Sequence, residues 1–442
     1  MLSNLGSYYN ISKLLTEISN LSATFDPSLR GHNLRVSLIS LSIATKLTFS
    51  RNFLLNVLIA SLLHDIGILF FKEKEQISLL REENFRDRAI HLHALIGYKL
   101  LNQYPFFREP ARIIRDHHRT YSEFVSSPSR FSFPAQILFL ADRVDVWVSN
   151  RLAKGYSLLE SIGLLREKLE RGRGTLFSPK LLDILFSFYY DREAFWFNIY
   201  TEEEYAKETV VDWLDRLDFT LSIEELLKTV NLFGFIIDFK SPFTATHSSG
   251  VAQTATHLAS YFHFSQEELR KMKIAGFLHD VGKILVPTEI LEKPGRLTDE
   301  EFFTMKSHVY HTYRILSRFI HNEDIVKWAS YHHEKLNGKG YPFKLKANQI
   351  PLGSRIMAIA DVFTALTEER PYKRAMSSSE ALEMLIQLSE KGELDRQIVS
   401  VLRENLKAID RSRQVAQNRA SELYRELERV VWEFNSSESE GC

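Results

Sequence analysis

The chain has 442 residues, of which 44% are hydrophobic and 25% charged, so a disordered chain is excluded and two or three folded domains are expected. Basic and acidic residues both number 56, and this balance argues against a nucleic-acid polymer as partner. The sole cysteine is Cys442, which excludes intrachain disulfides and cysteine-ligated zinc. We therefore expect a cytoplasmic protein.

The N-terminus carries no basic region followed by an apolar stretch, so no signal peptide is expected. The most apolar segment, Phe53 to Phe71, is interrupted by His64 and Asp65 well short of a membrane span. No membrane association is predicted.

Along most of the chain, apolar residues recur at helical spacing, which predicts an all-α fold. The first predicted helix, "NISKLLTEISNL", precedes a set of histidines and aspartates spread over the first half. The members of this set are His32, His64, Asp65, His93, His117, His118 and Asp142. A charged segment, 201–222, is predicted to be a helical linker, and the helix "LSIEELLKTVNL" then opens the second half.

The second half repeats the same residue types in the same order. Its members are His247, His279, Asp280, His308, His332, His333 and Asp361. In both halves 32 residues separate the first histidine from the His-Asp pair, 29 separate that pair from the next histidine, and 24 lead to the His-His pair. Only the interval to the final aspartate differs, 24 against 28 residues. This agreement predicts a duplication, with domains at 1–200 and 223–402 and a C-terminal helix and tail at 403–442.

Imidazole and carboxylate ligands without thiols suit iron, manganese or zinc. Seven ligands exceed what one such ion takes, and a carboxylate can bridge two ions, so a dinuclear centre is predicted in the second half. A lone buried histidine is more often a hydrogen-bonded core residue than a ligand, but a repeated set favours ligation. Adjacent residues of a helix point about 100° apart. The His-Asp and His-His pairs should therefore serve different ions or lie at helix ends.

Three motifs carry a family resemblance over residues 223–400. "FLHDVGK" at 277–283, "HHEKLNGKGYP" at 332–342 and "IADVFTALTEERPYKRA" at 359–375 resemble the HD-GYP subgroup of the HD phosphohydrolase superfamily. The resemblance implies an all-helical domain with a di- or trinuclear centre, frequently iron, that hydrolyses cyclic di-GMP to linear pGpG and further to GMP. Iron or manganese is then the expected metal. The first half would be a divergent HD domain without the GYP loop.

The resemblance also implies residue roles. One ion would be held by His247, His279, Asp280 and Asp361, and Asp280 would bridge to a second ion on His308, His332 and His333. Phosphate would be contacted by Lys283, Arg370 and Lys373, and Tyr341 would lie near the substrate or serve packing only. Physical chemistry supports Asp280 and Lys283 as catalytic residues, because two cations activate water and a fixed ammonium stabilises charge that grows on phosphoryl oxygens.

Two positions depart from the family pattern. Phe243 stands where some members have a glutamate that completes a third metal site, so two metals are predicted. Thr364 replaces a second aspartate of the third motif, which leaves substrate positioning in doubt. In the first half, Ile68 replaces Lys283 and "HHRTYSEFVSSP" replaces the GYP loop. Because its ligands are intact, that half is predicted to bind metal, with regulatory nucleotide binding or a different phosphohydrolase activity.

Other functions compete with cyclic di-GMP hydrolysis. A non-hydrolytic cyclic-dinucleotide sensor would use the same metal site, although Lys283 favours an enzyme. A second alternative is hydrolysis of another nucleotide such as cyclic GMP-AMP, because the sequence does not reveal base preference. The tail adds a narrow apolar stripe at Leu423, Leu427, Val430 and Phe434, which suits packing on the same chain or a homodimer seam.

Overall fold

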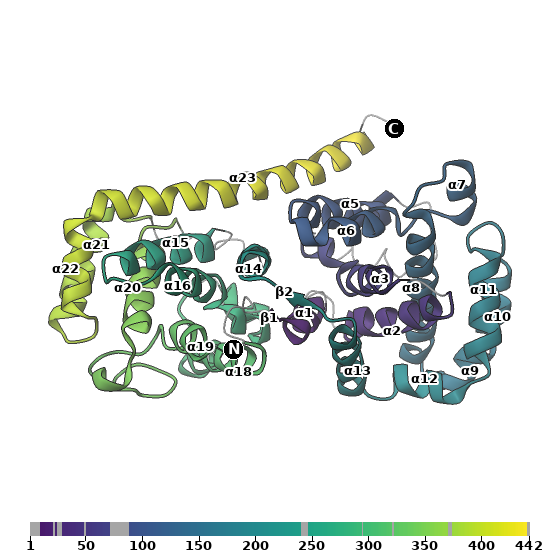
Figure 1. Cartoon of the computed structure of the whole chain (residues 1–442), viewed down its shortest axis with the longest axis horizontal. Helices are drawn as coiled ribbons and strands as arrows, with labels where there is room; N and C mark the ends of the chain where they lie inside the picture. The colour runs from purple at the N-terminus through teal and green to yellow at the C-terminus, as the bar shows by residue number, and fades with distance from the viewer. Residues whose placement is uncertain are drawn as a thin grey trace, which may run out of the picture. The chain divides into compact units, whose positions relative to one another are not determined.

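The computed structural model describes residues 9–20, 23, 29–47, 50–70, 88–239, 246–293, 295–320, 322–369 and 374–439. In this part of the chain nearly all regular structure is helical, and the strands are two residues long, so the all-α prediction is confirmed (Figure 1). The chain forms two compact units. The N-terminal unit comprises Ser12–Phe219 with Leu427–Cys442, and the C-terminal unit comprises Met1–Ile11 with Thr220–Glu426.

The helices of the N-terminal unit, with its 3-10 segments (η3, η5) and one π-helical segment (η6), follow in chain order. They are α1 (Ser12–Ser19), α2 (His32–Thr45), α3 (Arg51–Leu63), η3 (Ile66–Phe70), α5 (Arg88–Asn102), η5 (Pro105–Phe107), α6 (Arg108–Asp116), α7 (Tyr121–Ser126), α8 (Ser132–Ala153), α9 (Leu158–Gly163), α10 (Leu165–Glu170), α11 (Pro179–Leu185), η6 (Phe186–Tyr190), α12 (Glu193–Tyr200) and α13 (Glu203–Arg216).

The C-terminal unit contains both strands and the remaining helices. They are β1 (Tyr9–Asn10), β2 (Thr220–Leu221), α14 (Ile223–Phe239), α15 (His247–Ser260), α16 (Gln266–Leu278), η7 (Val281–Leu285), α17 (Thr288–Leu291), α18 (Asp299–Phe319), α19 (Glu323–Ser330), η8 (Ala347–Gln349), α20 (Leu352–Leu366), α21 (Ser378–Glu390), α22 (Arg396–Glu404) and α23 (Leu406–Ser439). The part of α23 from Leu427 onward belongs to the N-terminal unit. β1 and β2 pair antiparallel, with Tyr9 opposite Leu221.

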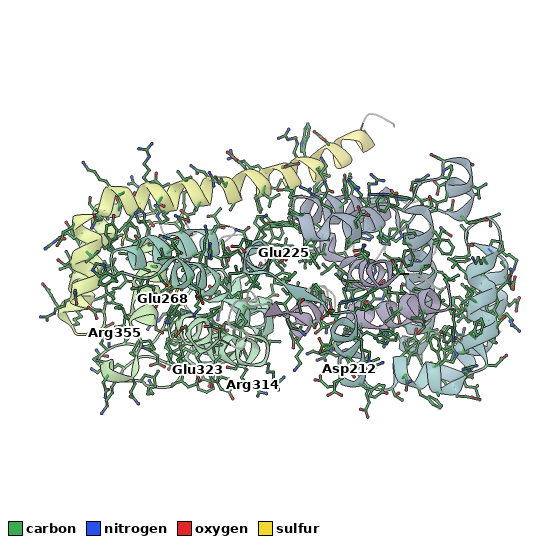
Figure 2. All side chains as sticks on the ribbon, in the orientation of Figure 1. Asp212, Glu225, Glu268, Arg314, Glu323 and Arg355 are labelled. Atoms are coloured by element: carbon green, nitrogen blue, oxygen red, sulfur yellow. The ribbon has the colours of Figure 1, made fainter. Side chains whose placement is uncertain are left out.

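Helix starts are fixed locally by capping boxes. Ser222 with Glu225 and Ser265 with Glu268 each exchange side-chain and backbone hydrogen bonds across the first turns of α14 and α16 (Figure 2). These contacts satisfy backbone N–H groups that the helix itself leaves without partners. The second box sets where α16 begins, and the cap at the other end of that helix is His279.

The two units repeat one set of elements around their ligands. In the N-terminal unit α2 packs on α3 and α8, and α5 packs on η3 and α6. In the C-terminal unit α15 packs on α16 and α20, and α18 packs on η7 and α19. A β-carbon on Gly67 would lie 2.0 Å from the carbonyl oxygen of His93, and one on Gly282 would lie 1.9 Å from that of His308. Only glycine allows this approach, and it occurs at the same place in both copies.

The segment 201–222, expected to be a linker, consists mainly of α13 and β2. Helix α13 packs on α1 and α2 in the N-terminal unit, where Lys207 forms an ion pair with Glu17 at 2.5 Å. The side chain of Phe434, from the expected apolar stripe of the tail, lies outside the described part.

One segment, Arg51–Phe70, is long and apolar enough to cross a membrane by length and composition alone. Of its most apolar 18-residue stretch, 78% is buried inside the protein. The segment also contains the buried residues His64 and Asp65. Such burial is typical of a core helix.

Candidate metal centres

The seven predicted ligands of the C-terminal unit converge on one place. The two oxygens of Asp280 face different groups of imidazoles. Oδ2 lies 3.3 Å from His279 Nε2 and 4.0 Å from His247 Nε2, whereas Oδ1 lies 3.3 Å from His308 Nε2. Two triads whose ligand atoms lie within 4.8 Å of one another result, His247–His279–Asp280 and His308–His332–His333. Asp280 is therefore placed to bridge two cations.

The remaining carboxylate also spans both triads. Asp361 Oδ1 lies 3.2 Å from His247 Nε2, and Asp361 Oδ2 lies 3.9 Å from His333 Nδ1. It projects from α20, whereas His247 is the first residue of α15. His279 caps the C-terminus of α16, and His332 and His333 come just after Tyr331, which caps the C-terminus of α19, so both adjacent pairs lie at helix ends.

Main-chain carbonyls set the protonation of most of these rings. His279, His308 and His332 direct Nδ1 to the carbonyl oxygens of Gly276, Met305 and Ala329, at 2.8, 2.6 and 2.6 Å. A ring that donates from Nδ1 keeps a lone pair on Nε2, which is the form that ligates metal. These three Nε2 atoms are buried without a hydrogen-bond partner in the described part of the chain. Such a donor set fits divalent cations.

Electrostatics divides the histidines into two kinds. Burial opposes charge on His247, but Glu368 and Asp361 outweigh it and raise its pKa well above the usual range. Burial lowers the pKa of His333 to about 4, and burial together with His333 lowers that of His332 strongly. The triad that contains His332 and His333 thus holds two imidazoles in the neutral, metal-binding form.

Lys283 and Tyr341 border the centre. Lys283, one turn after Asp280, donates from Nζ to Asp280 Oδ2. Burial opposes its charge, but Asp280 outweighs that effect and raises the pKa of Lys283. The ring of Tyr341 lies 4.8 Å from that of His333, and burial raises the pKa of its phenol, which therefore stays a hydrogen-bond donor.

The GYP loop is pinned by a residue that motif spacing did not reveal. Glu334 is buried and accepts from the backbone N–H groups of Phe343 and Leu345 at 2.7 and 3.0 Å. A β-carbon on Gly340 would lie 2.4 Å from Lys335 N. The loop that carries Tyr341 is therefore fixed beside His333.

A second unpredicted carboxylate, Glu368, accepts from His247 Nδ1 at 2.9 Å. Thr364, the position where an aspartate was missing, is fully buried and its hydroxyl has no hydrogen-bond partner in the described part. Three further positions lie outside the described residues. They are Arg370 and Lys373, which were expected to contact phosphate, and Phe243, which replaces the glutamate of a third metal site.

The seven predicted ligands of the N-terminal unit converge as well. The carboxylate of Asp65 lies 3.4 Å from His64 Nε2 and 3.5 Å from the Nε2 atoms of His32 and His93. His118 Nε2 lies 3.1 Å from His93 Nε2. Two triads again have ligand atoms within 4.8 Å of one another, and their members are His32, His64 and Asp142, and His93, His117 and His118. All six are buried.

Two charged residues distinguish this site from its C-terminal counterpart. Arg143, which the motif analysis missed, donates from Nη2 to Asp142 Oδ2 at 2.6 Å, so the site holds a fixed cation although Ile68 replaces the lysine. Asp145 accepts from His32 Nδ1 at 2.7 Å. Burial opposes charge on His32, but Asp142 and Asp145 together outweigh it and raise the pKa of His32 to about 10.

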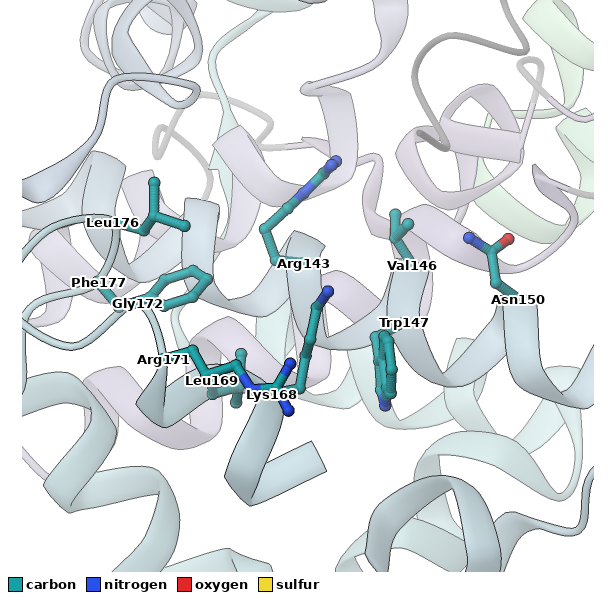
Figure 3. A pocket seen from close by; sticks show the side chains of 10 residues that line it. All are labelled: Arg143, Val146, Trp147, Asn150, Lys168, Leu169, Arg171, Gly172, Leu176 and Phe177. Carbon is teal, nitrogen blue, oxygen red and sulfur yellow. The ribbon is translucent and has the colours of Figure 1, made fainter. Parts of the chain in front are cut away.

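Arg143 also lines a cavity of about 160 Å³ (Figure 3). Trp147 and Phe177 provide aromatic walls, and Lys168 and Arg171 add positive charge. Lys168 Nζ lies 5.0 Å from the centroid of the Trp147 ring. The cavity thus combines ring surfaces with cations beside the N-terminal ligands.

Fold, duplicated ligand sets and close glycine contacts define a tandem HD-domain protein. Residues 231–398 and residues 29–147 each match the HD domain family. The chain belongs to the HD-domain phosphohydrolases, with an HD-GYP-type C-terminal half and a divergent N-terminal HD domain, and the family prediction is confirmed.

Particular relatives resemble it to different extents. The 3'3'-cGAMP-specific phosphodiesterase 1 of Vibrio cholerae is 32% identical over 382 residues, 85% of this chain and 87% of the relative. The cyclic di-GMP phosphodiesterase response regulator RpfG of Xanthomonas campestris is 38% identical over 36% of this chain and 42% of its own length. A crystal structure of a cyclic GMP-AMP-specific phosphodiesterase of Vibrio cholerae shares the fold, with a TM-score of 0.58 and 21% identity over 91% of this chain and 98% of that one.

Proposed function

We propose that the C-terminal unit is a dinuclear metal phosphodiesterase that opens a 3'3'-linked cyclic dinucleotide, with cyclic GMP-AMP preferred over cyclic di-GMP. The observation that carries the proposal is Asp280, whose two oxygens face separate groups of imidazoles with available Nε2 atoms. The base preference rests on the relative that matches most of this chain, which is named for 3'3'-cGAMP. The expected hydrolysis of cyclic di-GMP stays a prediction, supported by shorter matches.

Two ions bound between the triads would polarise a phosphoryl oxygen and lower the pKa of the attacking water. Lys283 stabilises charge on the same phosphate, and the phenol of Tyr341 can donate to a substrate oxygen. The water oxygen forms a bond to phosphorus while the bond from phosphorus to the 3' oxygen breaks, and that oxygen takes up a proton. The product is a linear dinucleotide with a 5' phosphate. Iron or manganese is proposed because the ligands are imidazoles and carboxylates.

Anaerobic purification with elemental analysis, followed by assays on 3'3'-cGAMP, cyclic di-GMP and cyclic di-AMP, tests this function. We expect bound metal and linear products, with 3'3'-cGAMP opened fastest and Asp280→Ala inactive. Faster turnover of cyclic di-GMP would overturn the base preference alone. A metal-loaded protein that binds these nucleotides without product would establish a sensor instead of an enzyme.

We further propose that the N-terminal unit binds metal and a small anionic ligand with one aromatic ring. Seven ligands converge there, and the neighbouring cavity of about 160 Å³ is similar in size to cavities of about 150 Å³ that hold a benzene ring. A mononucleotide fits this chemistry, as a regulatory ligand or as the substrate of a separate phosphohydrolase activity. Cytoplasmic location is proposed from the composition.

Metal counts on full-length variants test the N-terminal site. Asp65→Ala should lose metal that Asp280→Ala keeps, and the two losses should add in the double variant. If Asp65→Ala holds as much metal as the wild type, the N-terminal metal site is wrong. Incubation of Asp280→Ala with mononucleotides then distinguishes binding from hydrolysis at the N-terminal site. If no mononucleotide is bound or hydrolysed, both the regulatory role and the separate phosphohydrolase activity are excluded.

A further inference from the structure

The ligand His247 is oriented by a carboxylate that was not among the predicted site residues. Its Nδ1 lies 2.9 Å from Glu368 Oε2, whose side chain is 8% exposed. Glu368 stands seven residues after Asp361, just beyond the end of α20. Among the imidazoles of the C-terminal set, His279, His308 and His332 use main-chain carbonyls for the same purpose. His247 depends on a side chain instead.

The N-terminal unit performs this task with a different residue. There His32, the counterpart of His247, directs Nδ1 to Asp145, which stands only three residues after Asp142. The matching position in the C-terminal unit is Thr364, and the position that matches Glu368 is Ser149. Thr364 lies about one turn after Asp361 on α20, and Glu368 follows four residues later, just past the end of that helix. The orienting carboxylate has moved by one turn between the copies.

The partner of that carboxylate has changed in step. In the N-terminal unit Arg35 holds Asp145, with Nε 2.7 Å from Oδ1. The counterpart of Arg35 is Gly250, three residues after His247. A β-carbon on Gly250 would lie 2.8 Å from both Gln417 Nε2 and Thr364 Cγ2. The space that an arginine side chain would need is therefore occupied by Gln417, which comes from α23.

Helix α23 completes the support for Glu368. Gln417 donates from Nε2 to Glu368 Oε1 at 2.5 Å and accepts from Arg413 Nη1. Arg413 is buried and paired with Asp410 Oδ1 at 2.6 Å. Both oxygens of Glu368 are thus held, one by the ligand and one by a charged relay. All of these residues belong to the C-terminal unit.

We propose that Glu368 is a positioning residue for the metal ligand His247, and that Gln417 and Arg413 make the first part of α23 a component of the metal centre. The inference rests on the proposed dinuclear function. Outer-shell partners of ligating histidines fix ring orientation and raise ligand basicity, and their loss typically costs about 10- to 100-fold in metal affinity or activity. Glu368 touches neither metal nor substrate in this scheme.

The test measures three quantities on the full-length protein: the affinity for Mn²⁺, the kcat and KM of hydrolysis, and the thermal unfolding midpoint of the metal-free form. Glu368→Ala should weaken, by about 10-fold or more, the Mn²⁺ sites that Asp280→Ala abolishes, and lower kcat more than it raises KM. Gln417→Ala should act in the same direction but less. The matched control is Glu369→Ala, which removes the exposed neighbouring carboxylate and should leave all three readouts unchanged.

A rescue variant separates positioning from general stability. Thr364→Asp combined with Glu368→Ala places a carboxylate at the position that Asp145 has in the N-terminal unit and should recover most of the lost Mn²⁺ affinity. If Glu368→Ala binds Mn²⁺ and turns over substrate like Glu369→Ala, the inference is wrong. It is equally wrong if metal-free stability falls and Thr364→Asp restores nothing. A wild-type protein that binds no Mn²⁺ would instead refute the proposed function itself.

Discussion

Individual imidazoles in the C-terminal centre differ in the protons they carry before metal arrives. The pKa of His247 is raised well above its usual range because Glu368 and Asp361 outweigh burial, and Asp280 raises that of His279 in the same way. His332 and His333 are shifted down by burial. Protons therefore compete with metal for His247 and His279 more strongly than for His332 and His333.

This difference predicts a pH dependence of metal binding. The pKa of His247 lies well above its usual range, so this ring is protonated at neutral pH and must lose a proton before it can ligate metal. Metal affinity should therefore rise with pH. About one proton or more should leave as the His247–His279 triad fills, with about a tenfold gain in affinity per pH unit for each proton. Calorimetric Mn²⁺ titrations in buffers of different ionisation enthalpy measure this release. Affinity that stays constant between pH 6 and pH 8 would contradict it.

Lys283 supports a second prediction for a single side chain. Lys283→Met keeps the aliphatic stem but removes the charge beside Asp280, so kcat should fall by about 10²- to 10³-fold while metal content is retained. The matched control is Lys327→Met, which removes an exposed lysine paired with Glu323 at a helix surface. If the kcat of Lys283→Met lies within threefold of the wild-type value, Lys283 is not a catalytic residue.

At the scale of elements, each centre depends on the close packing of a 3-10 segment on a ligand-bearing helix. Gly282 in η7 approaches the main chain of α18 at His308, and Gly67 in η3 approaches that of α5 at His93. This approach brings the His-Asp pair beside the next histidine of each set. Local propensity contributes little to it, because the constraint acts between segments far apart in the sequence.

Gly282→Ala should therefore destabilise the C-terminal unit. The added β-carbon would lie 1.9 Å from the carbonyl oxygen of His308, so α18 must shift, and overpacking of this kind costs about 1–3 kcal/mol. Urea unfolding monitored by circular dichroism measures the loss, and Mn²⁺ affinity should fall with it. Gly163→Ala is the control, since a β-carbon there meets no atom within 4 Å. Equal unfolding midpoints for the two variants would refute the packing constraint.

Sequence spacing predicted the elements and ligands better than the groups that support them. Equal intervals selected two sets of seven residues, and the structure brings six of each set together in groups that could hold a metal ion. Spacing carries this signal because each side chain must reach one point from a fixed place on its helix. The supporting carboxylates Asp145 and Glu368 escaped notice because either of two positions one turn apart reaches the same ring. A search for acids three and seven residues after each final aspartate would have found both. Arg143 and Glu334 stand beside ligands and carry no periodic signal.

For the whole molecule, the duplication predicts that two metal centres stabilise the folded chain. Metal that binds only the folded state raises the unfolding midpoint, so a chelator should lower it. Asp65→Ala and Asp280→Ala should each retain part of the chelator response, and the double variant should retain none. Differential scanning calorimetry with and without chelator measures the shifts. If Asp280→Ala alone eliminates the response, the N-terminal unit holds no stabilising metal.

The main-chain carbonyls behind His64, His117, His279, His308 and His332 have an evolutionary consequence. A substitution at the residue that supplies such a carbonyl changes a side chain but leaves the oxygen in place, so the tautomer of these rings tolerates sequence drift. The tautomer of the first histidine in each unit is more sensitive to substitution, because its Nδ1 is bound by the side chain of Asp145 or Glu368. As the two halves diverged, the carboxylate that binds this Nδ1 could be lost only if another acid within reach replaced it. The two halves of the chain now use different acids, Asp145 and Glu368.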